Sequence, residues 1–104
     1  MEQIPTEDLK LLAEALDLPN IKVTSYDGQQ IQYRTHINQA LILFHPTESA
    51  DQCLMVLEWL DKNGALIIDN VGESDWCIAF EGENTFHKDF KTAVTLASIK
   101  YIKQ

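Results

Sequence analysis

The chain of 104 residues carries 16 acidic and 8 basic side chains, which gives a formal net charge of −8 with histidine neutral. Its length suits one domain, so we expect residues 1–104 to fold together. A hydrophobic content of 45% excludes intrinsic disorder. The acidic excess excludes a protein that grips nucleic acid or an anionic membrane directly, because Lys and Arg provide most of the affinity for those surfaces.

Two features bear on the compartment and on redox chemistry. The first residues lack the basic start and apolar stretch of a secretory signal, and no later segment approaches about 18 uncharged apolar residues. We therefore expect a cytoplasmic protein. Cys53 and Cys77 lie within the apolar runs C-L-M-V-L and W-C-I-A-F, not in a C-x-x-C pair. This setting predicts buried, unreactive thiols.

A first helix is predicted over residues 6–18, where Thr6 is the expected N-cap and Pro19 ends the helix. Glu7 and Asp8 suit the positive end of its dipole. Four apolar residues at helical spacing form its core face: Leu9, Leu12, Ala13 and Leu16.

Two alternating segments, residues 21–25 and 31–37, flank an Asp-Gly pair and predict a β-hairpin. A two-residue loop would oppose Val23 to Gln32 and mix apolar with polar side chains on each face. A three-residue loop opposes Val23 to Tyr33 and keeps one face apolar, so we expect the odd loop, with the glycine near a bulge.

The remaining segments predict further strands and two more helices. The S-x-x-Q sequence before residue 53 has the form of a capping box, and Asn63-Gly64 is a natural helix end. The expected strands cover residues 40–44, 65–69, 76–80 and 85–87, and the expected helices cover residues 50–62 and 89–103. Because the runs A-L-I-L-F, A-L-I-I and W-C-I-A-F do not alternate, both faces of the sheet should be covered. We therefore predict an α+β fold: an αβα sandwich with a mainly antiparallel sheet of about five strands covered by three helices.

Motifs for catalysis, cofactor binding or metal binding are not found in the sequence. It has no P-loop, dinucleotide fingerprint, nucleophile elbow or zinc-protease motif, and four glycines are few for a phosphate-cradling loop. The histidines are isolated: His36, His45 and His87. The spacing of Asp69, Glu73 and Asp75 fits no known cation loop and favours a solvated acidic turn. We expect no catalytic, cofactor-binding or metal-binding residues.

Apolar residues stand on the polar side of the helix predicted over residues 50–62. Met55 and Trp59, at i and i+4, fall among acidic and basic residues instead of joining the core stripe. Tryptophan is enriched in binding hot spots and methionine adapts to irregular partners, so the pair is a candidate contact patch. The alternative is that a terminus or loop of the same domain covers the pair.

The last predicted helix is apolar on two sides. One stripe contains Phe90, Val94 and Tyr101, and a second, nearly opposite stripe contains three residues: Leu96, Ile99 and Ile102. A helix apolar on two sides is usually buried on both. A second subunit or another partner is one candidate cover for the second stripe. The alternative is that the first helix and the sheet cover both stripes.

The segment from residue 44 to residue 103 contains a series of short patterns. They are His45-Pro46-Thr47, the helical M-V-L-E-W-L, Gly64 with A-L-I, W-C-I-A-F, and Ala93-Val94 to Ala97. In this order they resemble the phage ABA sandwich family of small phage and prophage proteins. The resemblance implies an αβα sandwich and a phage or mobile-element origin. It carries over no catalytic residue.

Three functions follow as hypotheses. The first is a non-catalytic protein-interaction module, phage- or prophage-encoded, that acts as a homodimer or docks on a host or phage protein through Met55, Trp59, Leu96, Ile99 and Ile102. The second is an acidic inhibitor of a nucleic-acid enzyme, an anti-CRISPR-like DNA mimic, with an acidic patch of Asp69, Glu73, Asp75, Glu81 and Glu83. The third, a small-molecule enzyme, requires a pocket that joins the scattered histidines and acids.

Overall fold

The computed structural model describes residues 4–24, 30–36, 38–71 and 75–104, and the chain divides into two compact units, residues 1–45 and 46–104. The described chain contains three helices and two three-stranded antiparallel sheets. This confirms the predicted α+β class with antiparallel strands. The strands form two small sheets instead of one sheet of about five, because each strand pairs with its neighbours in sequence within its own unit. The expectation of a single domain stays a prediction.

The first unit begins with α1 (Thr6–Ala15). Pro5, not Thr6, occupies the N-cap position, so the predicted cap is wrong by one residue. The helix also ends before residue 18, because Asp17 adopts a left-handed conformation (φ 60°) and the Leu18 N–H donates to the Ala13 carbonyl at 3.2 Å. Such a left-handed residue is a common helix end.

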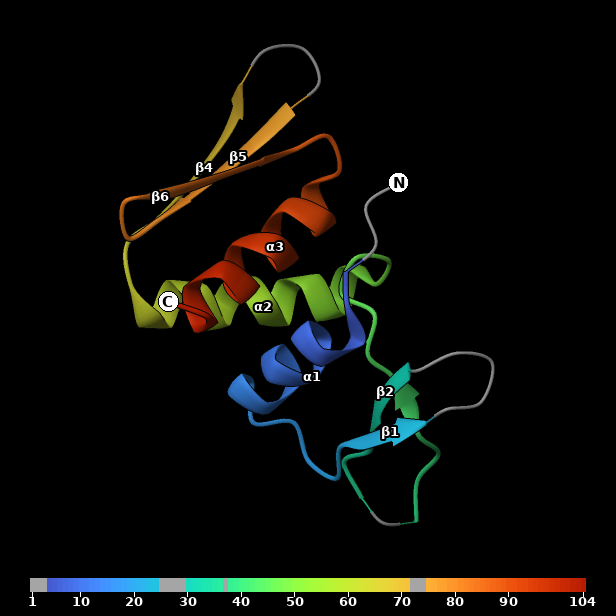
Figure 1. Cartoon of the computed structure of the whole chain (residues 1–104). Coiled ribbons are helices and arrows are strands. Elements are labelled where there is room, and N and C mark those ends of the chain that lie inside the picture. Colours follow the sequence, from blue (N-terminus) through green and yellow to red (C-terminus); the bar gives the residue numbers. More distant parts are fainter. Residues whose placement is uncertain (1–3, 25–29, 37, 72–74) are drawn as a thin grey trace. The chain divides into compact units, whose positions relative to one another are not determined.

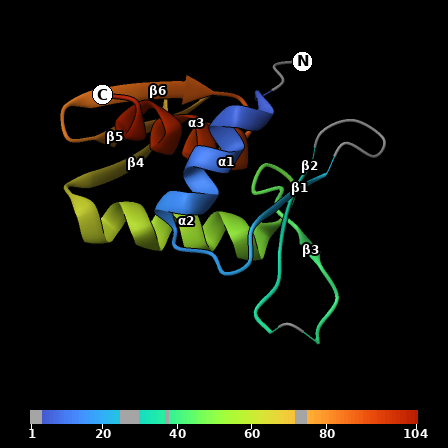
Figure 2. The ribbon, with the colours of Figure 1, turned by 60° about the horizontal axis from the view of Figure 1, so that its bottom comes forward.

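The strands of the first unit are β1 (Lys22–Thr24), β2 (Gln30–Tyr33) and β3 (Ile42–Leu43), which lie side by side in Figure 2. Val23 pairs with Ile31, so the predicted parity is confirmed but the register is shifted by two residues from the expected Val23–Tyr33 pair. The sheet keeps its apolar face, because a register shift of two residues leaves every side chain on the same face of the sheet. The expected turn and bulge lie outside the described residues.

This apolar face forms the core of the small sheet. Ile31 and Tyr33 are buried on β2, and Phe44, which follows β3, is 1% exposed. The Tyr33 and Phe44 rings meet edge to face with centroids 6.4 Å apart. The aromatic pair therefore joins β2 to the end of β3.

The second unit contains α2 (Ala50–Asn63), β4 (Leu66–Val71), β5 (Asp75–Phe80), β6 (Glu83–His87) and α3 (Phe90–Ile102). The Ser49 hydroxyl accepts from the Gln52 N–H at 3.2 Å, which confirms the predicted N-cap of α2. Asp89 caps α3 in the same way, since its Oδ2 accepts from the Thr92 N–H at 2.9 Å. Both helices thus begin where a side-chain oxygen satisfies a free backbone donor.

A two-residue turn of Glu81 and Gly82 joins β5 to β6. Both residues have positive φ, 48° and 85°, as in the tight turns whose twist suits a β-hairpin. The expected strands left residues 81–84 between them, and the observed turn is shorter, so β6 begins at Glu83 instead of residue 85.

Helix α3 packs on β5 and β6 and, on its other side, contacts α2 (Figure 1). Trp76 meets Phe90 with ring centroids 5.0 Å apart, and Phe80 meets Tyr101 at 4.8 Å. Ile78 between them is fully buried. The even-numbered side chains of β5 therefore point toward α3, and the odd-numbered ones point to the opposite face.

The opposite face of this sheet is open. Ile67 is 65% exposed and Phe86 is 56% exposed, so the prediction that both faces are covered is wrong for this sheet. The run W-C-I-A-F is apolar throughout, but it alternates in size. Its large side chains enter the core, and its small ones, Cys77 and Ala79, face outward.

Candidate functional site

The candidate site is the face of the β4-β5-β6 sheet that lies opposite α3. Cross-strand partners share a face, and the register places Ile67, Ala79 and Asn84 in one row and Asp69, Cys77 and Phe86 in the next. We call this surface the outer sheet face. It consists of Ile67, Asp69, Asp75, Cys77, Ala79, Asn84 and Phe86.

Two large apolar side chains stand on this face on either side of small ones. Ile67 on β4 lies beside Ala79, and Phe86 on β6 lies beside Cys77. Ala79 and Cys77 are both on the central strand, β5. Strands lie about 4.8 Å apart, so the two outer strands are separated by about 10 Å. Because Cys77 and Ala79 are small, they leave Ile67 and Phe86 accessible. One segment of a partner can contact both side chains across this distance.

The outer sheet face is also acidic. Asp69 and Asp75 are diagonal neighbours, because Asp69 pairs with Cys77 and Asp75 lies two residues before Cys77 on β5. Such diagonal positions are about 7–8 Å apart. Residues 65–88 contain five acids and a single lysine, Lys88. Exposed apolar side chains next to carboxylates suit a partner that is both apolar and basic.

The five acids proposed from the sequence do not share one surface. Asp69 and Asp75 belong to the outer sheet face, whereas Glu81 and Glu83 lie at the opposite end of β5, by the β5–β6 turn. Glu81 Oε2 accepts from the Ala65 N–H at 3.0 Å, and Glu83 lies 3.8 Å from the Lys100 ammonium. Glu73 lies outside the described residues.

The Met55–Trp59 pair is half-buried. The Trp59 ring meets Tyr101 of α3 with centroids 5.7 Å apart, and Tyr101 in turn meets Phe80. Tyr101 of α3, in the same unit, therefore covers part of the Trp59 ring. The exposed large apolar residue of α2 is Leu54, at 54%, which the sequence reasoning did not select.

The second stripe of α3 is largely covered within the chain. Ile99 is 6% exposed, and Leu96 and Ile102 are half-buried. The buried hydroxyls on the helix are satisfied locally, since Thr95 donates to the Lys91 carbonyl and Ser98 donates to the Val94 carbonyl. Ile99 is therefore not displayed for a partner.

Both cysteines are free and buried, as predicted. Burial raises the pKa of the Cys53 thiol, while the nearby Lys91 charge opposes part of that rise. A raised pKa means less thiolate at neutral pH, which disfavours nucleophilic chemistry. Cys77 lies on the outer sheet face but is 9% exposed, because Asp69 and Phe86 flank it on the neighbouring strands.

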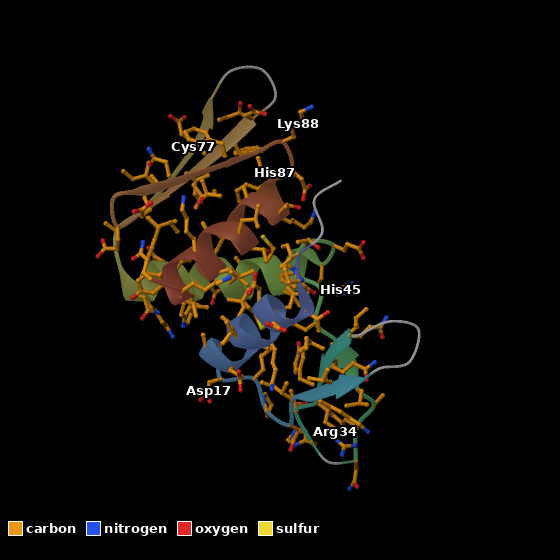
Figure 3. All side chains as sticks on the ribbon, viewed as in Figure 1. Asp17, Arg34, His45, Cys77, His87 and Lys88 are labelled. Atoms are coloured by element: carbon orange, nitrogen blue, oxygen red, sulfur yellow. The ribbon has the colours of Figure 1, made fainter. Side chains whose placement is uncertain are left out.

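The histidines occupy separate positions. His87, at the end of β6 next to Lys88 (Figure 3), accepts the Asp89 N–H through Nδ1 at 2.9 Å. His36 is exposed and His45 is half-buried, both in the first unit. Among the described residues, no three His, Cys, Asp or Glu side chains gather as a metal site. No helix in the described ranges has the length and apolarity to cross a bilayer.

Nothing matches this chain in comparisons with family models, curated proteins and solved structures. The resemblance to the phage ABA sandwich family stays a prediction.

Proposed function

We propose that this protein is a cytoplasmic, non-catalytic interaction module of phage or prophage origin, which docks on a partner protein through the outer sheet face. The observation that carries the proposal is the exposure of Ile67 and Phe86, 65% and 56%, on the side of the sheet away from α3. Fully burying one such side chain contributes about 1.5–3 kcal/mol. Two of them on one face form the apolar centre of the proposed contact.

Charge favours a different protein over a second copy. Two copies docked face to face would bring Asp69 and Asp75 toward the same residues of the other copy, and each chain carries a net charge of −8. Like charges brought together across an interface oppose association. The proposed partner therefore carries basic residues around an apolar centre.

The acidic inhibitor of a nucleic-acid enzyme is the weaker candidate. It needs a continuous acidic surface, and Glu81 and Glu83 both have partners within the chain. The overall charge alone supports it.

The test is affinity capture from a host lysate with the wild-type chain and with Ile67→Thr and Phe86→Thr, which keep good strand formers at both positions. We expect each variant to lose the captured partner while its circular dichroism stays unchanged. Leu54→Gln is the matched control, because Leu54 is exposed to a similar extent on α2. Capture that survives both sheet substitutions would refute the proposal. A dimer mass by light scattering that Phe86→Thr abolishes would replace the partner with a second copy.

A further inference from the structure

We infer that β4 is the recognition edge of this sheet, an inference that rests on the proposed docking function. An extended segment of the partner adds to β4 as a fourth strand. That segment is apolar on the side it shares with Leu66 and Ile68 and basic on the side it shares with Asp69.

The backbone of β4 is unpaired on one side of the strand. The sheet order is β4-β5-β6, so β4 is an edge strand. Ala65 exchanges hydrogen bonds with Glu81 on the β5 side, through its carbonyl at 3.1 Å and its N–H at 3.0 Å. Successive residues of an antiparallel strand point their backbone N–H and C=O groups to alternate sides. Because those of Ala65 point toward β5, those of Leu66, Ile68 and Asn70 point away from it. Among the described residues these groups have no hydrogen-bond partner, which leaves them available to an added strand.

Strand β4 extends beyond the area that α3 covers. Ile68 shares its face with Ile78, which is fully buried under α3, yet Ile68 is 42% exposed. The helix packs on β5 and β6. All four residues 67–70 are exposed. An added strand would therefore bury apolar surface on the α3 side of β4.

The two edges of the sheet differ. At β6, the Lys100 ammonium donates to the Asn84 carbonyl at 3.0 Å and lies near Glu83. A lysine at a strand edge is a usual protection against unwanted pairing. Strand β4 contains neither lysine nor proline. Lys100 therefore protects the β6 edge against strand addition, and β4 has no such protection.

Charge identifies the occupant. Asp69 lies on the outer side of this edge strand, Asp75 lies diagonal to it on the central strand β5, and β4 has no basic residue of its own. Two copies paired antiparallel about Ile68 would set Asp69 beside Ile67 of the other copy, and pairing about Asp69 would oppose two carboxylates. Neither register provides a cation. The complementary strand therefore belongs to another protein and alternates apolar with Lys or Arg.

The experiment uses two end-blocked peptides of eight residues, one alternating valine with arginine and one alternating valine with glutamate. Binding to the full chain is measured by fluorescence anisotropy at low salt, and amide exchange is followed by NMR. We expect the Val/Arg peptide to bind and to slow exchange at the N–H groups of Leu66, Ile68 and Asn70. We expect the Val/Glu peptide not to bind.

Two variants test the two recognition elements separately. Asn70→Pro removes one outward N–H at an edge, where proline is tolerated, and should weaken Val/Arg binding about two- to tenfold. Asp69→Asn should weaken it about two- to fivefold and reduce its salt dependence. Asp61→Asn, on the exposed surface of α2, is the matched control for charge and should change nothing. If Asn70→Pro does not fold, Asp69→Asn and the exchange pattern decide the question.

Equal binding of both peptides, no binding of either, or binding without protection of these three amides would each overturn the inference. The failure is distinguishable from that of the proposed function. Partner capture that depends on Phe86, on β6, but is unchanged by Asn70→Pro would leave face docking in place and exclude strand addition.

Discussion

Glu81 binds both polar backbone groups of Ala65: its N–H donates to the Ala65 carbonyl at 3.1 Å, and its Oε2 accepts from the Ala65 N–H at 3.0 Å. The Glu81 side chain therefore hydrogen-bonds the end of the sheet where the chain passes from α2 into β4. Its position depends on Gly64, since a β-carbon on Gly64 would lie 2.6 Å from Glu81 Cγ and 2.9 Å from Phe80 Cζ. Gly64 has a φ of 171°, so the requirement is for space and not for an unusual backbone.

Gly64→Ala should lower the free energy of unfolding by about 1–3 kcal/mol, because the added methyl displaces the Glu81 arm and presses on the buried Phe80 ring. Urea denaturation measures the loss. The same substitution in a Glu81→Ala background should cost at least about 0.5 kcal/mol less, because one of the two clashes is gone. Equal costs in both backgrounds would show that Glu81 does not cause the crowding.

Asp89→Ala should lower the free energy of unfolding by about 1 kcal/mol, because it removes the N-cap of α3. The Thr92 hydroxyl, which donates to Asp89 Oδ2 at 2.6 Å, lowers the pKa of this carboxyl, and the Thr92 N–H and the Lys91 charge add to the shift. A lowered pKa in the folded state means that the contribution is complete above the unfolded value of about 3.9 and is lost as the pH falls through the folded pKa.

The difference between the wild type and Asp89→Ala should therefore shrink in urea titrations as the pH falls below about 4. Glu58→Ala, an exposed carboxylate within α2, is the control and should change stability by less than about 0.5 kcal/mol at neutral pH. A difference that stays constant from pH 7 to pH 3 would contradict the assigned hydrogen bonds.

Trp59→Ala should lower the free energy of unfolding by about 2 kcal/mol and leave partner capture unchanged. The Trp59 ring contacts Tyr101 at 5.7 Å inside the second unit, so the substitution removes packing between α2 and α3. Leu54→Ala, at 54% exposure on the same helix, should cost less than about 0.5 kcal/mol. Loss of capture with unchanged stability would restore Trp59 as a contact residue.

The two thiols should react with an alkylating reagent at least about tenfold more slowly in the native protein than in denaturant. Cys53 is 3% exposed and its pKa is raised by burial, and Cys77 is 9% exposed. Mass spectrometry of the alkylated chain, with Cys53→Ser and Cys77→Ser to assign each site, measures both rates. Fast native labelling of Cys77 would show that Asp69 and Phe86 do not shield it.

Local signals in the sequence predicted most of the elements. Ser49 caps α2 as its S-x-x-Q pattern indicates, and the last helix begins at Phe90, one residue after the expected start, with Asp89 as its N-cap. The parity of the first hairpin was also predictable, because an odd shift would have placed polar side chains on the apolar face of β2. Its register was not, because a shift of two residues preserves that face.

The candidate site was harder to predict. Met55 and Trp59 were selected because they break the stripe of α2, yet Tyr101 of α3 reaches the Trp59 ring. Ile67 and Phe86 were missed, because the run A-L-I-I was expected to be covered on both faces and residues 85–87 were predicted only as a short strand. The usable signal was size, because Cys77 and Ala79 alternate with larger residues on β5.

By itself, the sequence determined the α+β class, the three helices, the antiparallel hairpins and the buried thiols, because these depend on periodicity, caps and turns within a few residues. The tertiary structure alone decided which acids have partners, which apolar residues stay exposed, and that β6 has a lysine at its edge while β4 has none. These properties arise where strands and helices far apart in sequence meet. Lys100 reaches Asn84, 16 residues away, and no spacing along the chain encodes that contact.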